Sequence, residues 1–343
     1  ARRARVLVFF IILRFKVMAN IRFLSDNGNK KKIKSNISCK IIGFFVLLQS
    51  ERGLYAPYTL LYIEKYKIIY REIRTIISQF MDKKIKALFF DIDGTLVSFK
   101  THKIPQSTVD ALEAAKENGV EVYISTGRPP MIITNLGQIE HLIDGYITTN
   151  GARCFVGDKV VCQHAILPSD VDKIIAASDR DDYPAIVVGE HRIAIHHYTD
   201  EVYDIFAKGL GVDFDVFLHD VKDLGDEAVL QVTPFCSVEQ EAQLMPTLQN
   251  CNSGRWHPAF TDITAGDADK GKGLHAMVDY LGLKIEETMA FGDGGNDISI
   301  VREAGVGVAM GNAGDNLKAV ADYITTSVDE DGVKNALEKY GVI

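Results

Sequence analysis

The sequence lacks any arrangement of cysteines that would bind a metal or build a disulfide framework. Its 343 residues include only Cys39, Cys154, Cys162, Cys236 and Cys251, and no two of them form a CxxC pair. An odd and scattered set of this kind is typical of reduced thiols in a cytosolic protein. We therefore predict a cytoplasmic location and a fold that does not depend on disulfide bonds.

Long apolar runs are also absent. The two apolar runs near the start of the chain, residues 6–13 and 41–48, are each eight residues long. A membrane-spanning helix needs about 20 such residues. We therefore expect no stable membrane span.

Residues 1–80 differ from the rest of the chain in charge. They carry sixteen Lys and Arg against four Asp and Glu, whereas the remaining residues carry 22 against 42. An acidic body of this kind argues against a general nucleic-acid-binding surface. Because residue 1 is Ala and the composition changes near Met81, we expect translation to begin at Met81 and residues 81–343 to be the functional unit. A targeting or membrane-surface extension is the alternative interpretation of residues 1–80.

Residues 81–343 alternate short apolar runs with segments of helical period. This alternation is typical of an α/β fold with a doubly wound, Rossmann-like parallel sheet. Apolar spacing and glycine stops set the expected bounds of each element. We expect strands at 85–90, 120–126, 145–152, 288–293 and 306–311, and helices at 106–119, 131–142, 270–282, 297–305, near 315–321 and at 331–340.

A block of about a hundred residues interrupts this alternation, which is long enough for a small domain. Residues 153–255 begin with a hairpin-like stretch and then mix helical and strand patterns. We therefore expect a core domain formed by residues 81–152 and 256–343, with an inserted α+β domain at 153–255.

Polar residues follow several predicted strands directly. Asp91 and Asp93 follow the first strand in "KALFFDIDGTL", Thr126 follows the second, and Asp293 follows a later one. Ligands of open parallel sheets bind beyond the carboxyl ends of the strands, so we expect these side chains to meet at one edge. Side chains two residues apart in a strand share a face, which places Asp91 and Asp93 together. Gly94 then permits a sharp turn.

Each signal alone also has an ordinary structural explanation. The aspartate pair resembles a calcium loop, but the glycine and glutamate that such a loop requires are missing. Thr126 alone fits a strand-end hydroxyl, Lys270 a solvated lysine and Asp297 a helix N-cap. The stretch "GDGGND", residues 292–297, is harder to explain, because its two carboxylates repel one another unless a cation or hydrogen bonds offset the repulsion.

Taken together and in this order, the motifs resemble the haloacid dehalogenase superfamily of phosphotransferases. The matching stretches are "FFDIDGTL", "YISTGR", "DADKGKGL" and "FGDGGNDISIVREAG". The continuation "VGVAMGNAGDNLKAVADYIT" is similar to the Cof-type subfamily, and the 144 positions from Thr126 to Lys270 fit its inserted type IIB cap domain. The resemblance covers essentially all of residues 81–343.

The resemblance implies a Mg²⁺-dependent phosphatase that works through an aspartyl-phosphate intermediate. Asp91 would be the nucleophile, because a carboxylate can attack phosphorus. Asp93 would protonate the leaving alcohol and then activate water. The implied Mg²⁺ ligands are the Asp91 carboxylate, the Asp93 backbone carbonyl and Asp293, which are the hard oxygen donors that this ion prefers. Asp297 would bind the ion directly or support the residues that do.

The resemblance also implies which residues bind the phosphate. Thr126 and the Gly127 amide would donate hydrogen bonds to it, and Lys270 would neutralise charge on both the phosphoryl group and the nucleophile. Asn296 would orient the phosphate, and we expect Arg128 and Asn150 in the same pocket. The expected catalytic and substrate-binding residues are thus Asp91, Asp93, Thr126, Lys270, Gly127, Asn296, Arg128 and Asn150.

The expected substrate is a small-molecule phosphate ester, with sugar phosphates as the first candidates. Pyridoxal phosphate and flavin mononucleotide are the alternatives within the same chemistry, and a phosphomutase is a further one. A non-catalytic sensor of phosphorylated ligands would not need Asp93 as an acid, so this residue favours an enzyme. The sequence carries no signal for the oligomeric state.

One histidine-rich stretch lies in the predicted inserted domain. "HRIAIHH", residues 191–197, places His191 and His197 on one face of a predicted strand. Three histidines are compatible with a metal site, but a strand with polar residues that face solvent or the active site explains them equally well. Both interpretations remain open on the sequence alone.

Overall fold

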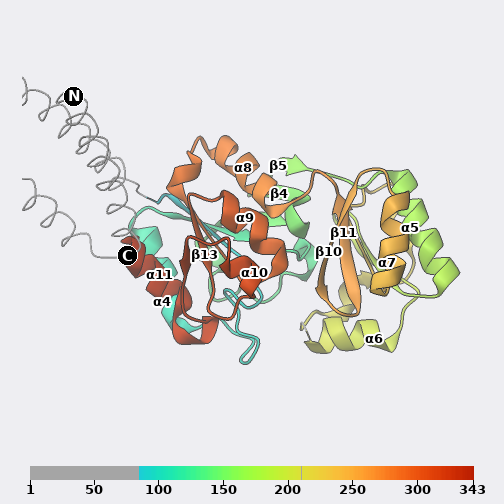
Figure 1. The fold of residues 1–343 in the computed structure, drawn as a ribbon, viewed down its shortest axis with the longest axis horizontal. Coiled ribbons are helices and arrows are strands. Elements are labelled where there is room, and N and C mark those ends of the chain that lie inside the picture. The colour runs from blue at the N-terminus through green and yellow to red at the C-terminus, as the bar shows by residue number, and fades with distance from the viewer. Residues whose placement is uncertain (1–84, 210) are drawn as a thin grey trace, which may run out of the picture. The chain divides into compact units, whose positions relative to one another are not determined.

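The computed structural model describes residues 85–209 and 211–343, which form two sheets flanked by helices (Figure 1). The expectations for residues 1–80 and for a start at Met81 lie outside the described residues. Among the described residues, no helix has the length and apolar character needed to cross a bilayer.

The larger sheet has eight strands and is mostly parallel. Its order is β14-β13-β12-β1-β2-β3-β4-β5, and only the last two strands run antiparallel to their neighbours. The strands are β1 (Ala87–Phe90), β2 (Glu121–Ser125), β3 (Ile143–Thr148), β4 (Arg153–Val156), β5 (Lys159–Gln163), β12 (Thr288–Gly292), β13 (Val306–Ala309) and β14 (Tyr323–Ile324). We call this part of the molecule the core.

Helices cover both faces of the core sheet, which explains the continuous apolar strands. Leu88 and Phe90 of β1 pack on one side, and Ala87 and Phe89 pack on the other. The first side is covered by α4 (Gln106–Glu117) and α11 (Gly332–Tyr340). The second is covered by α8 (Lys270–Leu281), α9 (Ile298–Glu303) and α10 (Asp315–Lys318).

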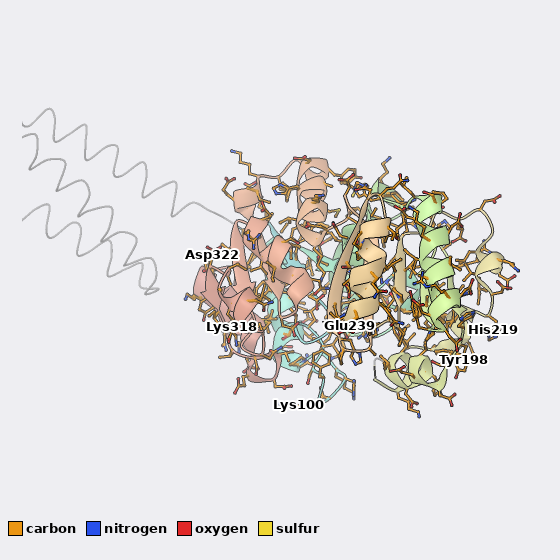
Figure 2. The ribbon with its side chains drawn as sticks, turned by 45° about the vertical axis from the view of Figure 1, so that its right-hand side comes forward. Lys100, Tyr198, His219, Glu239, Lys318 and Asp322 are labelled. Atoms are coloured by element: carbon orange, nitrogen blue, oxygen red, sulfur yellow. The ribbon has the colours of Figure 1, made fainter. Side chains whose placement is uncertain are left out.

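The second sheet has six strands in the order β10-β11-β9-β6-β7-β8. We call it, with its helices, the cap. Its helices α5 (Pro168–Asp181) and α7 (Val238–Leu244) pack against one face, and α6 (Asp200–Tyr203) lies near the other. In Figure 2, Lys318 and Asp322 mark the core end of the molecule, and Tyr198 and His219 mark the cap end. The strands are β6 (Ala185–Val188), β7 (Ile193–His196), β8 (Phe217–Leu218), β9 (Gln231–Pro234), β10 (Cys251–His257) and β11 (Phe260–Ala265).

Strand pairing differs from the predicted domain boundaries at both ends of the insertion. The β4–β5 hairpin, which we expected in the inserted domain, pairs with β3 and extends the core sheet. Residues 260–265, which we expected in the core, form strand β11, which pairs with β9 and β10 in the cap. An apolar strand pattern does not say which neighbour completes its hydrogen bonds, so the sequence could not fix these two boundaries.

One predicted helix is wrong. Residues 131–142 form no α-helix, only short 3₁₀ turns at Pro130–Ile132 and Glu140–Leu142. The buried Ile132, Leu136 and Ile139 are spaced as they would be on a helix. Gly137 disfavours a helix within the segment, and Pro129 and Pro130 directly precede it. The other predicted strands and helices of the core are confirmed to within a few residues.

Candidate active site

The loop after β1 carries the two aspartates of the first motif. Asp91 is buried, and its backbone amide donates to the Phe291 carbonyl of β12 at 3.1 Å. Gly94 has a φ of +86°, and a Cβ at this position would lie 2.2 Å from Oδ2 of Asp293. The glycine therefore both makes the turn and lets the first motif approach the fourth.

Lys270 is the first residue of α8, and its side chain is fully buried. Its Nζ lies 2.7 Å from Oδ1 of Asp91 and 2.6 Å from Oδ1 of Asp297. The helix begins here because Asp269 caps it, accepting a hydrogen bond from the Lys272 amide. Burial opposes the charged lysine, but the two carboxylates outweigh that effect and hold the pKa of Lys270 above its usual value.

Three carboxylates meet at this edge, and Lys270 contacts two of them. Asp91, Asp293 and Asp297 each place one oxygen within 4.8 Å of the others. Burial raises the pKa of Asp91 well above its usual value despite Lys270, and burial together with the Asp297 charge raises the pKa of Asp293 to about 7. When all three are ionised, these carboxylates carry more negative charge than the nearby ammonium offsets. The donor set therefore fits a divalent cation that prefers oxygen ligands, as Mg²⁺ does.

The acidic loop after β12 is held by its own hydrogen bonds. Oδ2 of Asp297 accepts from the amides of Asp293 and Gly294, at 3.0 and 2.9 Å. Thr95 Oγ1 donates to Asp293 Oδ1 at 3.0 Å, and Asn312 Nδ2 donates to Asp293 Oδ2 at 3.2 Å. These contacts fix the direction of both carboxylates before any ligand arrives.

Asp93 is paired with Arg128. The guanidinium donates from Nε to Asp93 Oδ2 at 2.7 Å and from Nη2 to Oδ1 at 2.8 Å. Its Nη1 also donates to the Ile132 carbonyl at 3.1 Å, which anchors the buried arginine. A two-pronged pair of this kind sets both the distance and the plane of the carboxylate.

Thr126, Gly127 and Asn150 lie together at the same sheet edge. Thr126 follows β2, which pairs in parallel with β1, so it ends beside the Asp91 loop. The backbone amide of Asn150 donates to the backbone carbonyl of Thr126. A Cβ on Gly127 would lie 3.0 Å from the Asn150 side chain. Asn296 Nδ2 donates to Asn150 Oδ1 at 3.0 Å. Every residue predicted for the site therefore lies in this part of the core.

Several site residues were not predicted. Thr95 and Asn312 contact Asp293, and Asn312 follows β13 at the same edge, so the argument from strand ends would have found it. Gln231 and Asp262 of the cap contact Asn150. No sequence signal pointed to these two, because neither follows the end of a core strand.

The histidine-rich stretch of the cap forms a second group. Nε2 of His196 and Nε2 of His197 lie 2.8 and 3.1 Å from Oδ1 of Asp179 on α5. The two rings stack with their centroids 4.0 Å apart. His191, which we had expected on one face with His197, is not part of this group.

Comparisons with known proteins find matches over most of the described residues. A family model described as haloacid dehalogenase-like hydrolase matches residues 88–337. Among curated proteins, YkrA of Bacillus subtilis (strain 168) is 30% identical over 268 residues, covering 77% of this chain and all of that protein. The 5-amino-6-(5-phospho-D-ribitylamino)uracil phosphatase YcsE of the same organism is 29% identical over 262 residues, covering 76% of this chain and 97% of that one.

Solved structures extend the comparison to the whole described unit. A subclass IIB sugar phosphatase of the same superfamily, BT4131, is 47% identical with a TM-score of 0.72, covering 75% of this chain and all of that chain. The phosphatase BT1666 from Bacteroides thetaiotaomicron is 35% identical with a TM-score of 0.68, covering 76% and 97% of the two chains. Core and cap are therefore both shared with these proteins.

Proposed function

This chain belongs to the haloacid dehalogenase-like hydrolase family, and we propose that it is a Mg²⁺-dependent phosphatase of small phosphate esters, sugar phosphates in particular. One observation carries the proposal: the buried Lys270 ammonium lies between the carboxylates of Asp91 and Asp297. A lysine placed in this way stabilises the ionised form of a nucleophilic carboxylate and also attracts a phosphoryl group.

Asp91 acts as the nucleophile in this proposal. One of its oxygens forms a bond to phosphorus while the bond from phosphorus to the alcohol oxygen breaks. The leaving oxygen takes a proton from Asp93. In the second half, Asp93 takes a proton from water. The water oxygen bonds to phosphorus while the bond from phosphorus to the Asp91 oxygen breaks, which releases inorganic phosphate and restores the Asp91 carboxylate.

Asp93 must change partners during this cycle. Both of its oxygens accept hydrogen bonds from Arg128. To give a proton to the leaving alcohol, one oxygen has to leave the guanidinium and turn toward the substrate. Arg128 thus positions the acid between turnovers and holds it beside the phosphate site.

The Mg²⁺ ligands in this proposal are the Asp91 carboxylate, the Asp93 backbone carbonyl, Asp293 and Asp297. When bound, Mg²⁺ reduces the repulsion between the carboxylate nucleophile and the anionic phosphate. The Asp293 side chain is already directed by Thr95 and Asn312, so little rearrangement of the protein is needed.

Hydrogen-bond donors at the sheet edge bind the phosphate in the same scheme. Thr126, the Gly127 amide, Lys270 and Asn296 donate to its oxygens, and each such donor typically contributes about 10²–10³ in rate. Asn150 supports Asn296 through their direct hydrogen bond. The cap would cover the bound ester and exclude water while the phosphoryl group is transferred. We place the enzyme in the cytoplasm, in keeping with its unpaired cysteines among the described residues.

Two substrate groups are supported by relatives. BT4131 is titled a sugar phosphatase, and YcsE is named a phosphatase of a phosphoribitylamino uracil. Both kinds of molecule carry hydroxylated carbons beside the phosphate. The higher identity to BT4131 makes sugar phosphates the first choice and the phosphoribityl compound the second.

The proposal is tested by phosphate release from a panel of esters. The panel contains hexose and pentose phosphates, a ribityl phosphate, pyridoxal phosphate, flavin mononucleotide and p-nitrophenyl phosphate. We expect turnover with Mg²⁺ that disappears with EDTA and in Asp91→Asn. Binding without release would indicate a sensor, and a requirement for a bisphosphate activator with little net release would indicate a mutase.

A further inference from the structure

The cap sheet turns one face toward α5 and α7 and the other toward the core and α6. Val187 and Val232, which pair across β6 and β9, pack in the cluster under these helices. Ile186 and Val188 point to the opposite face, where they pack with Ile132 of the core. Alternate residues of each strand therefore separate the two faces.

The core-facing side of the cap sheet is apolar in one half and polar in the other. Gln231 and Thr233 of β9 lie directly beside Val188 and Ile186, so they share the core-facing side. Thr264 of β11 pairs with Gln231, and Asp262 lies two residues before it on the same side. We call Gln231, Thr233, Asp262 and Thr264 the polar patch; all four are at most 6% exposed.

The polar patch is held together by a central carboxylate. Oδ1 of Asp262 accepts from Thr233 Oγ1 at 2.7 Å and from Gln231 Nε2 at 3.1 Å. Burial of a carboxylate and two amide or hydroxyl groups contributes less to stability than apolar side chains of similar size would. Strands β6 and β7 show that apolar residues can fill this same face. Stability of the fold therefore does not explain the patch.

The patch lies one side chain away from the phosphate site. Asn150 Nδ2 is 3.3 Å from Asp262 Oδ2 and 3.4 Å from Gln231 Oε1. On its other side, Asn150 contacts Asn296 and lies against Gly127. Asn150 has a φ of +53°, so the backbone is held in the left-handed region to aim this side chain. Groups attached to a bound phosphate would therefore reach the patch.

We propose that the polar patch binds the hydroxyl groups on the carbons next to the phosphate, and so selects phosphorylated sugars and polyols. The proposal rests on the phosphatase function proposed above. A carboxylate accepts hydrogen bonds from two hydroxyls, and the amides of Gln231 and Asn150 both donate and accept. The contacts of Asn150 with the patch are long for hydrogen bonds, so substrate hydroxyls can replace them at little cost.

The same hydrogen bonds also predict that the polar patch discriminates against phosphate esters without hydroxyl groups. A site built to hydrogen-bond a hydroxyl discriminates strongly against an analogue that lacks it, because its buried polar groups are then left unpaired. An aryl phosphate such as p-nitrophenyl phosphate offers no hydroxyl to the patch. The ratio of kcat/KM for a sugar phosphate to that for p-nitrophenyl phosphate therefore reports on the patch, whereas the chemical step is common to both.

The test compares this ratio in wild type and in Asp262→Asn, using glucose 6-phosphate, ribose 5-phosphate and ribitol 5-phosphate. We expect the ratio for the best of these esters to fall by about 10–100-fold. Thr233→Val keeps the side-chain shape, removes one donor to Asp262 and should lower the ratio by a smaller factor. It keeps the test valid where Asp262→Asn does not fold.

The matched control is Asp170→Asn. Asp170 is also a buried carboxylate of the cap, bonded to Lys173 and to the Gln249 amide on the side away from the patch. Its substitution should leave the ratio unchanged. An unchanged ratio in both Asp262→Asn and Thr233→Val, or an equal fall in Asp170→Asn, would overturn the proposal.

A binding measurement separates this proposal from the phosphatase function. In Asp91→Asn, calorimetry compares the Kd of glucose 6-phosphate, ribose 5-phosphate and ribitol 5-phosphate with that of inorganic phosphate. Tighter binding of at least one of these esters than of phosphate, lost on adding Asp262→Asn, supports the patch even if wild type releases no phosphate. Binding no tighter than that of phosphate for all three would refute the patch and leave the phosphatase function intact.

Discussion

The edge of the core sheet and the core-facing side of the cap sheet both bury carboxylates, but different kinds of side chain contact them. At the core edge, three aspartates lie together, and the ammonium of the buried Lys270 contacts two of them. In the cap, Asp262 accepts hydrogen bonds from the neutral side chains of Thr233 and Gln231. A site that needs a cation is suited to transfer of a phosphoryl group, and a site of hydrogen-bonding groups is suited to recognition of hydroxyls.

From this difference we expect variants of the two regions to affect substrates in different ways. Changes at the core edge should affect every substrate alike, because all esters share the phosphoryl group. Changes in the polar patch should affect substrates unequally. A core variant that altered selectivity but not rate would break this division of roles.

The largest effect is expected for Asp91→Asn. An amide is a poor nucleophile, so kcat for every ester should fall by at least about 10⁴-fold. Phosphate release from the full ester panel measures this. Asp170→Asn, which changes a buried carboxylate away from the site, should retain activity; comparable losses in both variants would mean that burial, not nucleophilicity, explains the result.

The second largest loss of activity is expected for Lys270→Met. Loss of the ammonium leaves Asp91 and Asp297 without their cationic partner, which destabilises the fold by about 3 kcal/mol in EDTA. Activity should fall by about 10²–10³-fold on all esters. Denaturant titration with and without Mg²⁺ checks the first part, and Mg²⁺ should restore some stability. A variant as stable as wild type in EDTA would contradict the account.

Sequence reasoning found the core edge because its residues follow strand ends in short motifs. Asp91 and Asp293 could be placed from the rule that parallel strands end at one edge, and the structure brings them together. The cap offered no equivalent rule. Gln231 and Asp262 lie inside strands that pair across the cap sheet, so their shared face depends on a register that only the structure supplies.

Prediction of the fold also succeeded in the core and failed where it depended on pairing between distant strands. The apolar strands and helices of the core were predicted closely, because each buries a recognisable face. The stretch 131–142 misled the prediction, since its apolar residues pack into turns. Assignment of β4, β5 and β11 to one sheet or the other depends on long-range pairing, which local patterns do not encode.

Mg²⁺ should stabilise the protein through the core edge. Ligand binding at a hundred times its Kd adds about 2.7 kcal/mol to the free energy of unfolding. The melting temperature should therefore rise with Mg²⁺, and Asp293→Asn should remove most of the rise. Asp179→Asn, which changes the histidine-bound carboxylate of the cap, should keep it. An equal rise in Asp293→Asn would place the cation elsewhere.

Arg128→Lys should have the smallest effect of the changes considered in this Discussion. Lysine cannot reproduce the two-pronged contact with Asp93, so kcat should fall by about tenfold with a smaller change in KM. Steady-state kinetics on p-nitrophenyl phosphate measure both constants. Arg180 makes the same kind of pair with Asp181 at an exposed position, and Arg180→Lys should change neither constant.

The most direct test of the central claim is capture of the covalent intermediate. Wild-type protein is mixed with Mg²⁺ and the best ester of the panel, quenched in acid within milliseconds and digested for mass spectrometry. We predict one phosphoryl group on the peptide that contains Asp91, and none in Asp91→Asn. Rapid turnover with no phosphorylated peptide, or a phosphoryl group on another residue, would contradict the account.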